Sequence, residues 1–165
     1  RIDSLVVKPF QYSKSIQYVS AEIAKEIKFR NWALDNRVKL QEVQQDAKIL
    51  NLPNIVLRNT LYYTKPVFKK AMLMQTGVTL NYFSKYYADD YIGVLGEFYV
   101  QDQSKVGGFP VLDFFVNARV QQCRIYLKAE HFNVLFTNKV DYYNTPNYPF
   151  RDFHIRFGLE WNFFK

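Results

Sequence analysis

Two neighbouring carboxylates, Asp89 and Asp90, form the most compact group in this sequence that could do chemistry. They stand in the run YYADDY at 86–91, and Ca²⁺ is bound in proteins by clustered carboxylate and carbonyl oxygens. The run has the composition of a loop and lacks the ligand spacing of a calcium-binding loop. We therefore interpret the pair as solvated loop carboxylates, and a calcium site stays open as the alternative.

Other catalytic or metal-binding groups are sparse. Cys123 is the one cysteine, so no internal disulfide can form. His131 and His154 have no metal-ligand spacing with it, and we interpret both as solvated or rim side chains. Ser, His and Asp all occur, but without the nucleophile-and-base pattern that catalysis needs. We expect no enzyme, no cofactor and no metal site.

Charged and polar side chains at alternating positions of extended segments could instead act on ions. If those segments are strands of a barrel, these side chains face the lumen. There they either pair across strands and brace the wall, or form a ring that biases ion flow. Our candidates are Arg58, Asp113, Asn117, Arg119, Arg124, Lys128, Glu130, Arg156 and Glu160. We place Arg119, Arg124 and Arg156 toward the periplasmic half, where neighbouring cations would favour anions.

The segments that must position these side chains alternate apolar and polar residues with period two, which predicts strands. The alternation is clearest at 112–120, 123–130 and 153–163 and less regular at 32–41, 55–63 and 72–82. The segment 20–29 would also suit a short amphipathic helix, but we predict a strand because both neighbours are strands. About eight strands fit if 2–10 supplies the first.

The connections between these segments alternate in length. Short ones lie near 29–31, 65–69 and 121–122, and longer polar ones lie at 45–54, 87–110 and 136–152. Short periplasmic turns and long external loops are typical of outer-membrane barrels, and segments of this length suit tilted crossings of about 9–11 residues. We predict an all-β, antiparallel transmembrane β-barrel of the outer-membrane type, with residues 1–165 as a single domain and the C-terminus periplasmic.

Composition agrees with a membrane barrel and argues against both a helical membrane protein and a nucleic-acid-binding protein. Aromatic residues make up 18% of the chain, with 13 Tyr and 15 Phe. No run approaches the roughly 18 apolar residues that a membrane helix needs, so any crossing must use strands closed into a barrel. The net charge is +7, but Lys and Arg are spread along the chain, which argues against nucleic-acid binding.

The last strand carries a specific pattern: polar, any, Gly, any, any, aromatic, any, aromatic. Its defining residues are Arg156, Gly158, Trp161 and Phe163. The pattern resembles the β-signal of outer-membrane proteins, which the barrel-assembly machinery reads. Trp161 and Phe163 would face lipid at the periplasmic interface, and Gly158 would permit close approach or a kink on the lumen face. The signal usually ends at or next to the terminal aromatic residue, whereas Phe164 and Lys165 follow here.

The chain also resembles the C-terminal region of the putative porins of Bacteroidota-type bacteria. The similar segments are NTLYY at 59–63, KPVFKK at 65–70, TGVTLNYFSKY at 76–86, GEFYVQ at 96–101, DFFVN at 113–117, KAEHFN at 128–133, Tyr148-Pro149 and the terminal strand. Such porins are several times longer. The resemblance therefore implies that this chain, which starts at Arg1, is the C-terminal part of a larger barrel.

Three functions remain open. The first is a porin-like channel through which small hydrophilic solutes diffuse. The second is a structural or accessory barrel in a larger outer-membrane complex for transport, secretion or assembly, without an open pore. The third is a soluble β-barrel or sandwich that binds a small ligand. For the first two we expect contacts with outer-membrane lipid and lipopolysaccharide, the barrel-assembly machinery and other outer-membrane subunits, and none with nucleic acid.

Overall fold

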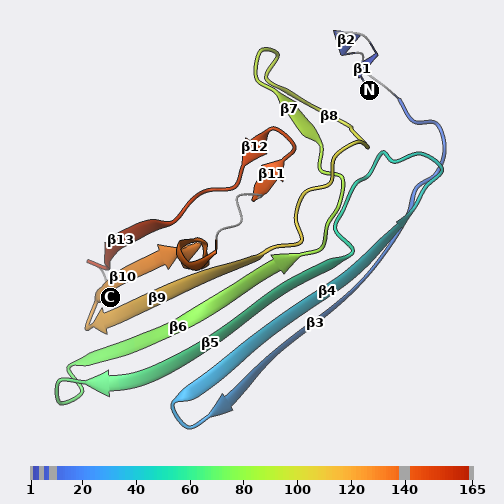
Figure 1. Cartoon of the computed structure of the whole chain (residues 1–165). Coiled ribbons are helices and arrows are strands. Elements are labelled where there is room, and N and C mark those ends of the chain that lie inside the picture. The colour runs from blue at the N-terminus through green and yellow to red at the C-terminus, as the bar shows by residue number, and fades with distance from the viewer. Residues whose placement is uncertain (1, 4–5, 8–10, 138–141, 164–165) are drawn as a thin grey trace.

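Seven long strands lie side by side in one curved antiparallel sheet (Figure 1). The structure is a computed structural model, and it describes residues 2–3, 6–7, 11–137 and 142–163. The strands are β3 (Gln17–Phe29), β4 (Trp32–Gln44), β5 (Ile55–Val67), β6 (Met72–Phe83), β9 (Pro110–Val120), β10 (Cys123–Glu130) and β13 (His154–Trp161). Each pairs with the one before and after it in the chain. The predicted all-β antiparallel fold is confirmed, and so is the strand at 20–29.

About eight strands were predicted, and the described residues contribute seven to the large sheet. The expected first strand, 2–10, lies partly outside them, and its described pieces form a sheet of their own. Ile2–Asp3 (β1) pairs with Val6–Val7 (β2) and with no strand of the large sheet. The sheet is open, and β3 and β13 are its two edge strands.

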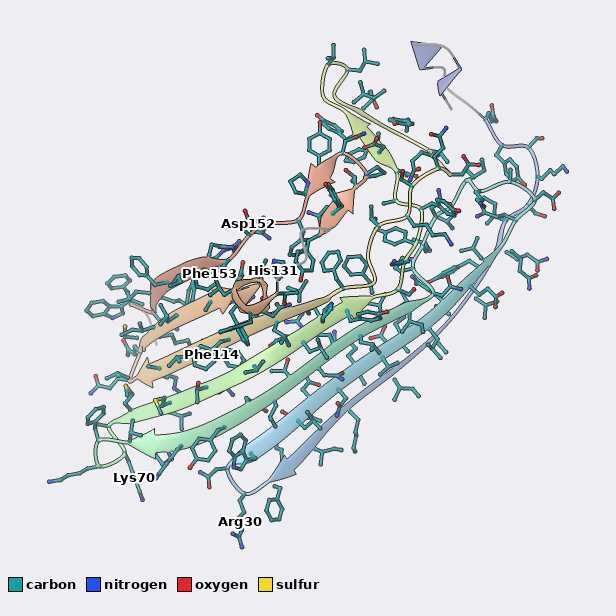
Figure 2. The ribbon with its side chains drawn as sticks, in the orientation of Figure 1. Arg30, Lys70, Phe114, His131, Asp152 and Phe153 are labelled. Atoms are coloured by element: carbon teal, nitrogen blue, oxygen red, sulfur yellow. The ribbon has the colours of Figure 1, made fainter. Side chains whose placement is uncertain are left out.

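One end of the sheet, the turn end, holds the short turns at 30–31, 68–71 and 121–122. The first residues of the two shortest turns, Arg30 and Gln121, have φ of 55° and 50°. Figure 2 labels Arg30 and Lys70 at this end. The middle turn lies later than the predicted 65–69, because β5 continues through Pro66, opposite Leu73. Pro is tolerated there because β5 has run past the end of β4 and is locally an edge strand.

The opposite end, the loop end, carries the long connections 45–54, 84–109 and 131–153, so the predicted alternation of short and long connections is confirmed. These loops contain small elements: β7 (Asp90–Ile92), β8 (Glu97–Tyr99), the 3₁₀ helix η1 (Phe132–Phe136), β11 (Tyr143–Thr145) and β12 (Tyr148–Pro149). Figure 1 shows β7, β8, β11 and β12 clustered beyond the strands. No helix in the described ranges is long and apolar enough to span a membrane.

The register gives the sheet two chemically different faces. One cross-strand row on the first face is apolar on all seven strands: Ile155, Ala129, Phe114, Val78, Leu61, Leu34 and Ile27. The neighbouring row on the second face is polar: Asp113, Thr79, Thr60, Asp35 and Glu26. We call these the apolar face and the polar face.

Most of the buried apolar residues lie at the loop end and do not pack against a face of the sheet. The buried apolar residues of the described chain are Ala33, Ala88, Val106, Phe109 and Val111. The ring of Phe109 contacts those of Phe83, Tyr142 and Phe150, with centroids 4.8–5.6 Å apart. The loops therefore pack on one another through aromatic side chains.

Asp90 ties two of these loops together. Its carboxylate accepts hydrogen bonds from the Tyr99 hydroxyl at 2.9 Å, from the Tyr91 backbone N–H at 2.9 Å and from Asn147 Nδ2. Burial, and then the bond to Asp90, raise the pKa of Tyr99, so its hydroxyl remains a donor at neutral pH. Asp90 is 2% exposed, and its interpretation as a solvated carboxylate is wrong. No group of three His, Cys, Asp or Glu in the described ranges could hold a metal ion.

We expect Asp90→Asn to loosen both loops while leaving the seven-stranded sheet intact. An amide at position 90 has only one acceptor oxygen in place of the two of the carboxylate, and one buried donor left unpaired costs about 1–3 kcal/mol. Hydrogen exchange of the amides at 90–99 and 142–150 should accelerate about tenfold or more. Asp102→Asn, at an exposed position of the same loop, is the control, and equal exchange in the two variants would contradict the role of Asp90.

Candidate functional site

The polar face carries all nine residues that the alternation assigned to a lumen. Register places Arg58 on β5, three on β9, three on β10 and two on β13, all on this side of the sheet. The face surrounds a cavity of about 720 Å³, and Arg58, Asp113, Asn117 and Lys128 are among its lining residues. The cavity wall offers charges of both signs together with hydroxyl and carboxamide groups.

Near the loop end, Glu130 is the centre of an ion-pair network. Its side chain is 13% exposed, and its oxygens lie 2.9 Å from Lys128 Nζ, 2.6 Å from His154 Nε2 and 3.3 Å from Arg156 Nη2. Lys128 Nζ also lies 3.0 Å from Asp113 Oδ2. These five residues, which we call the Glu130 cluster, connect β9, β10 and β13. The charges here brace the wall, which is one of the two roles considered for them.

His131 links this network to the loops. It is 2% exposed, so its interpretation as a solvated or rim side chain is wrong. Its backbone N–H donates to Asp113 Oδ1 at 3.0 Å, and its Nδ1 lies 2.8 Å from the Arg151 carbonyl oxygen.

Aromatic rings enclose the His131 side chain: those of Phe109, Tyr142 and Phe150 have centroids 6.4, 4.9 and 5.2 Å from the imidazole. Figure 2 labels His131 beside the 3₁₀ helix, at the loop end of β10. Asp113 and His131 therefore join the wall of the sheet to the loop that follows β10.

Two pairs of arginines stand directly opposite each other on the polar face. Arg37 is the register partner of Arg58, and Arg119 is the register partner of Arg124. Like charges in this position repel. One member of each pair has an acid nearby, at 3.8 Å for Arg37–Glu22 and 3.9 Å for Arg124–Glu160. Within the described ranges, Arg58 and Arg119 have no ion pair.

Arg37 was not among the predicted site residues, although the alternation at 32–41 already placed it on the polar side. Glu22, Glu26, Asp35, Thr60, Tyr62, Thr79 and Asn81 were also missed and lie on the same face. The sequence contained the information needed to find them, because within each segment the apolar–polar alternation places these residues on the polar side.

The position predicted for Arg156 along its strand is wrong. Arg119 and Arg124 lie beside the 121–122 turn, as expected, but Arg156 lies two residues after His154, where β13 begins at the loop end. Arg156 bonds Glu130 there, so it strengthens the loop-end network and does not add to the cations at the turn end.

The four residues of the terminal pattern divide between the two faces. Trp161 and Phe163 lie on the apolar face, exposed, with their rings stacked 5.4 Å apart at an interplanar angle of 9°. Gly158 lies on the polar face opposite Tyr126, and a Cβ added to it would come within 2.5 Å of that ring. Of the two expected roles for Gly158, the structure therefore supports close approach, and what approaches is the Tyr126 ring.

One protein-family model matches almost the whole chain. A family model described as "Putative porin" matches residues 4–165. Searches of curated proteins and of solved structures give no match.

We expect Gly158→Ala to destabilise the sheet by forcing the Tyr126 ring out of its place. Overpacking of this kind costs about 1–3 kcal/mol, and thermal or urea unfolding of the purified protein would measure it. In a Tyr126→Ala background, Gly158→Ala should lower the free energy of unfolding by much less. Gly93→Ala, whose Cβ would meet nothing nearer than 3.3 Å, is the control. An equal loss with and without Tyr126 would show that the ring is not the cause.

Proposed function

The chain belongs to the putative porin family, whose model matches residues 4–165, and on that premise we propose that it forms part of a transmembrane β-barrel in the bacterial outer membrane. The barrel lets small hydrophilic solutes diffuse through a charged lumen. We extend the assignment to Bacteroidota-type bacteria from the resemblance of the sequence segments.

The observation that carries the proposal is the uncovered apolar face. Phe157 is 83% exposed and Ile23 73%, and both belong to rows of large apolar side chains that no other described element covers. Covering one such side chain is worth roughly 1.5–3 kcal/mol, and the face has many. A soluble sandwich would bury them against a second layer, whereas bilayer hydrocarbon covers them directly.

Closure of the barrel needs further strands, and the topology limits their number. β3 and β13 both run from the loop end to the turn end, while every pair in the sheet is antiparallel. These two edges can therefore join in an antiparallel barrel only through an odd number of additional strands. The total would then be even, which is the rule for bacterial outer-membrane barrels.

The proposed orientation puts the turn end and the C-terminus in the periplasm and the loop end outside. The outer part of the apolar face then contacts lipopolysaccharide, and the remainder contacts lipid. The terminal strand, with Trp161 and Phe163 on the apolar face, is the segment that the barrel-assembly machinery reads during insertion.

We expect the full-length protein to form stable channels in a planar bilayer with a modest preference for anions. The reason is the two arginine pairs, because a unit charge about 7 Å away in water contributes about 0.6 kcal/mol. Replacing Arg58 and Arg119 together by Gln should lower the anion-to-cation permeability ratio at least about twofold. Lys65→Gln, on the apolar face, is the matched control. A barrel that never conducts and purifies with a stoichiometric partner would instead support the accessory-subunit function.

We expect the double change Trp161→Ala and Phe163→Ala to block insertion, because it removes both rings from the terminal signal. The measurement is the amount of heat-modifiable barrel in outer-membrane fractions. The double change Ile155→Ala and Leu159→Ala removes two apolar side chains from the same face of β13 and should insert far better. Normal levels of the Trp161 and Phe163 variant would refute the signal.

A further inference from the structure

A row of three polar residues crosses the apolar face. Lys25 on β3 is the register partner of Asn36 on β4, and Asn36 is the register partner of Asn59 on β5. β3, β4 and β5 lie side by side in Figure 1. We call these three residues the polar row.

The polar row lies within apolar surroundings. The residues two positions before and after its members, on the same face, are Ile23, Ile27, Leu34, Val38, Leu57 and Leu61. Elsewhere on this face the described strands have one other polar residue away from their ends, Thr76, and its hydroxyl donates to the Phe115 carbonyl oxygen at 3.0 Å. Glu42 lies near the loop end of the sheet and Lys65 near the turn end.

The polar row would lie deep in a bilayer. Each member is four residues from an aromatic side chain at the turn end, namely Phe29, Trp32 or Tyr63. Four residues span about 13 Å of strand, and at the usual tilt of barrel strands this is about 10 Å of depth in an apolar band about 25 Å tall. Trp32 and Tyr63 pack against each other with centroids 5.0 Å apart, as interface aromatics do. The row is thus close to the middle of the band.

The polar groups of the row are unsatisfied within the described part of the chain. Lys25 has no ion pair there, and neither carboxamide makes a side-chain hydrogen bond. Asn59 Oδ1 is enclosed and without a partner. Hydrocarbon offers no partners, and ionisable residues at such depth are costly and typically mark a contact with another polar group.

We propose that the polar row is where two copies of this protein meet in the plane of the membrane. The inference rests on the proposed function, since it requires the chain to be part of an outer-membrane barrel. A twofold axis along the membrane normal, beside Asn36, sets the two Asn36 carboxamides face to face, where each can donate to and accept from the other.

The same axis brings Lys25 of each copy to the side on which the other copy carries Asn59. A half-turn of the Asn59 amide about χ2 then presents its oxygen to the ammonium group. The two lysines lie on opposite sides of the axis, so the contact is self-complementary, as a twofold interface must be.

A strand added to the edge of the same barrel does not account for the row. Neighbouring strands are about 4.8 Å apart, so a strand paired with β3 could reach Lys25 but would lie about 14 Å from Asn59. The three residues are satisfied together only by a partner that lies over the face.

Cysteine cross-linking of the full-length protein in native outer membranes tests the inference. In a Cys123→Ser background, Asn36→Cys removes the carboxamide pair on the axis but keeps the two Lys25–Asn59 contacts beside it. This variant should give an oxidant-induced dimer of two identical chains in more than half of the molecules. Leu127→Cys, exposed on the apolar face of β10, should give at least fivefold less. Val38→Cys, the next residue on the same face of β4, replaces Asn36→Cys if that variant does not insert.

Adding Lys25→Met to the cysteine variant should lower the dimer yield at least fivefold while heat-modifiable barrel is retained. An unchanged yield, equal cross-linking from Leu127→Cys, or cross-links only to a different protein would overturn the inference. Failure of the proposed function has a separate signature. In that case the parent protein would be missing from the outer membrane or would show no heat-modifiable form, whereas an inserted barrel without dimers rejects the inference alone.

Discussion

The backbone hydrogen-bond register of the seven-stranded sheet is the constraint on which the other features depend. Side chains alternate between faces with period two, so a slip of one residue in any pairing would carry a strand's apolar side chains to the polar face. The six pairings of the large sheet run without a register shift. The apolar row from Ile27 to Ile155 and the charged wall with Glu130 and Arg58 are two consequences of that one alignment.

This arrangement reverses the usual distribution of a globular domain. The large apolar side chains of the strands are exposed, and most of the charged ones are gathered on the polar face, where several of them pair. The enclosed aromatic residues, Phe109 chief among them, lie in the loops. A sheet of this kind depends on its surroundings for the apolar face and on ion pairs such as Lys128–Asp113 for the polar one.

Much of the sheet could be predicted from the sequence, because alternation is a local property. The parity that placed Arg124 and Lys128 on one face needs no knowledge of neighbouring strands. The segment 20–29 was less clear by itself, and it was predicted as a strand because both neighbouring segments are strands. Prediction failed where the structure depends on distant partners. Pro66 suggested a turn, since the sequence does not show that β4 ends before β5 does. Ile2–Phe10 suggested an eighth strand, yet its described pieces pair only with each other.

The candidate site also divides into residues that local alternation could predict and residues that depend on distant partners. Its strand residues were predictable, and this holds for Arg37 as well, because the alternation at 32–41 already placed it on the polar side. Asp90 and His131 could not be recognised, because loops have no period and the partners of these residues, such as Asn147 and Tyr142, are far along the chain.

The loop-end contacts also have a consequence for motion. The loop at 84–109 and the loop at 131–153 share the Asp90–Asn147 hydrogen bond, the Tyr91–Tyr148 ring contact and the packing of Phe109 on Tyr142 and Phe150. Neither loop can move outward without breaking contacts that hold the other. Fluctuations at this end of the sheet should therefore be concerted, with one relaxation time for both loops, and their amplitude is limited by the Asp113–His131 bond to β9.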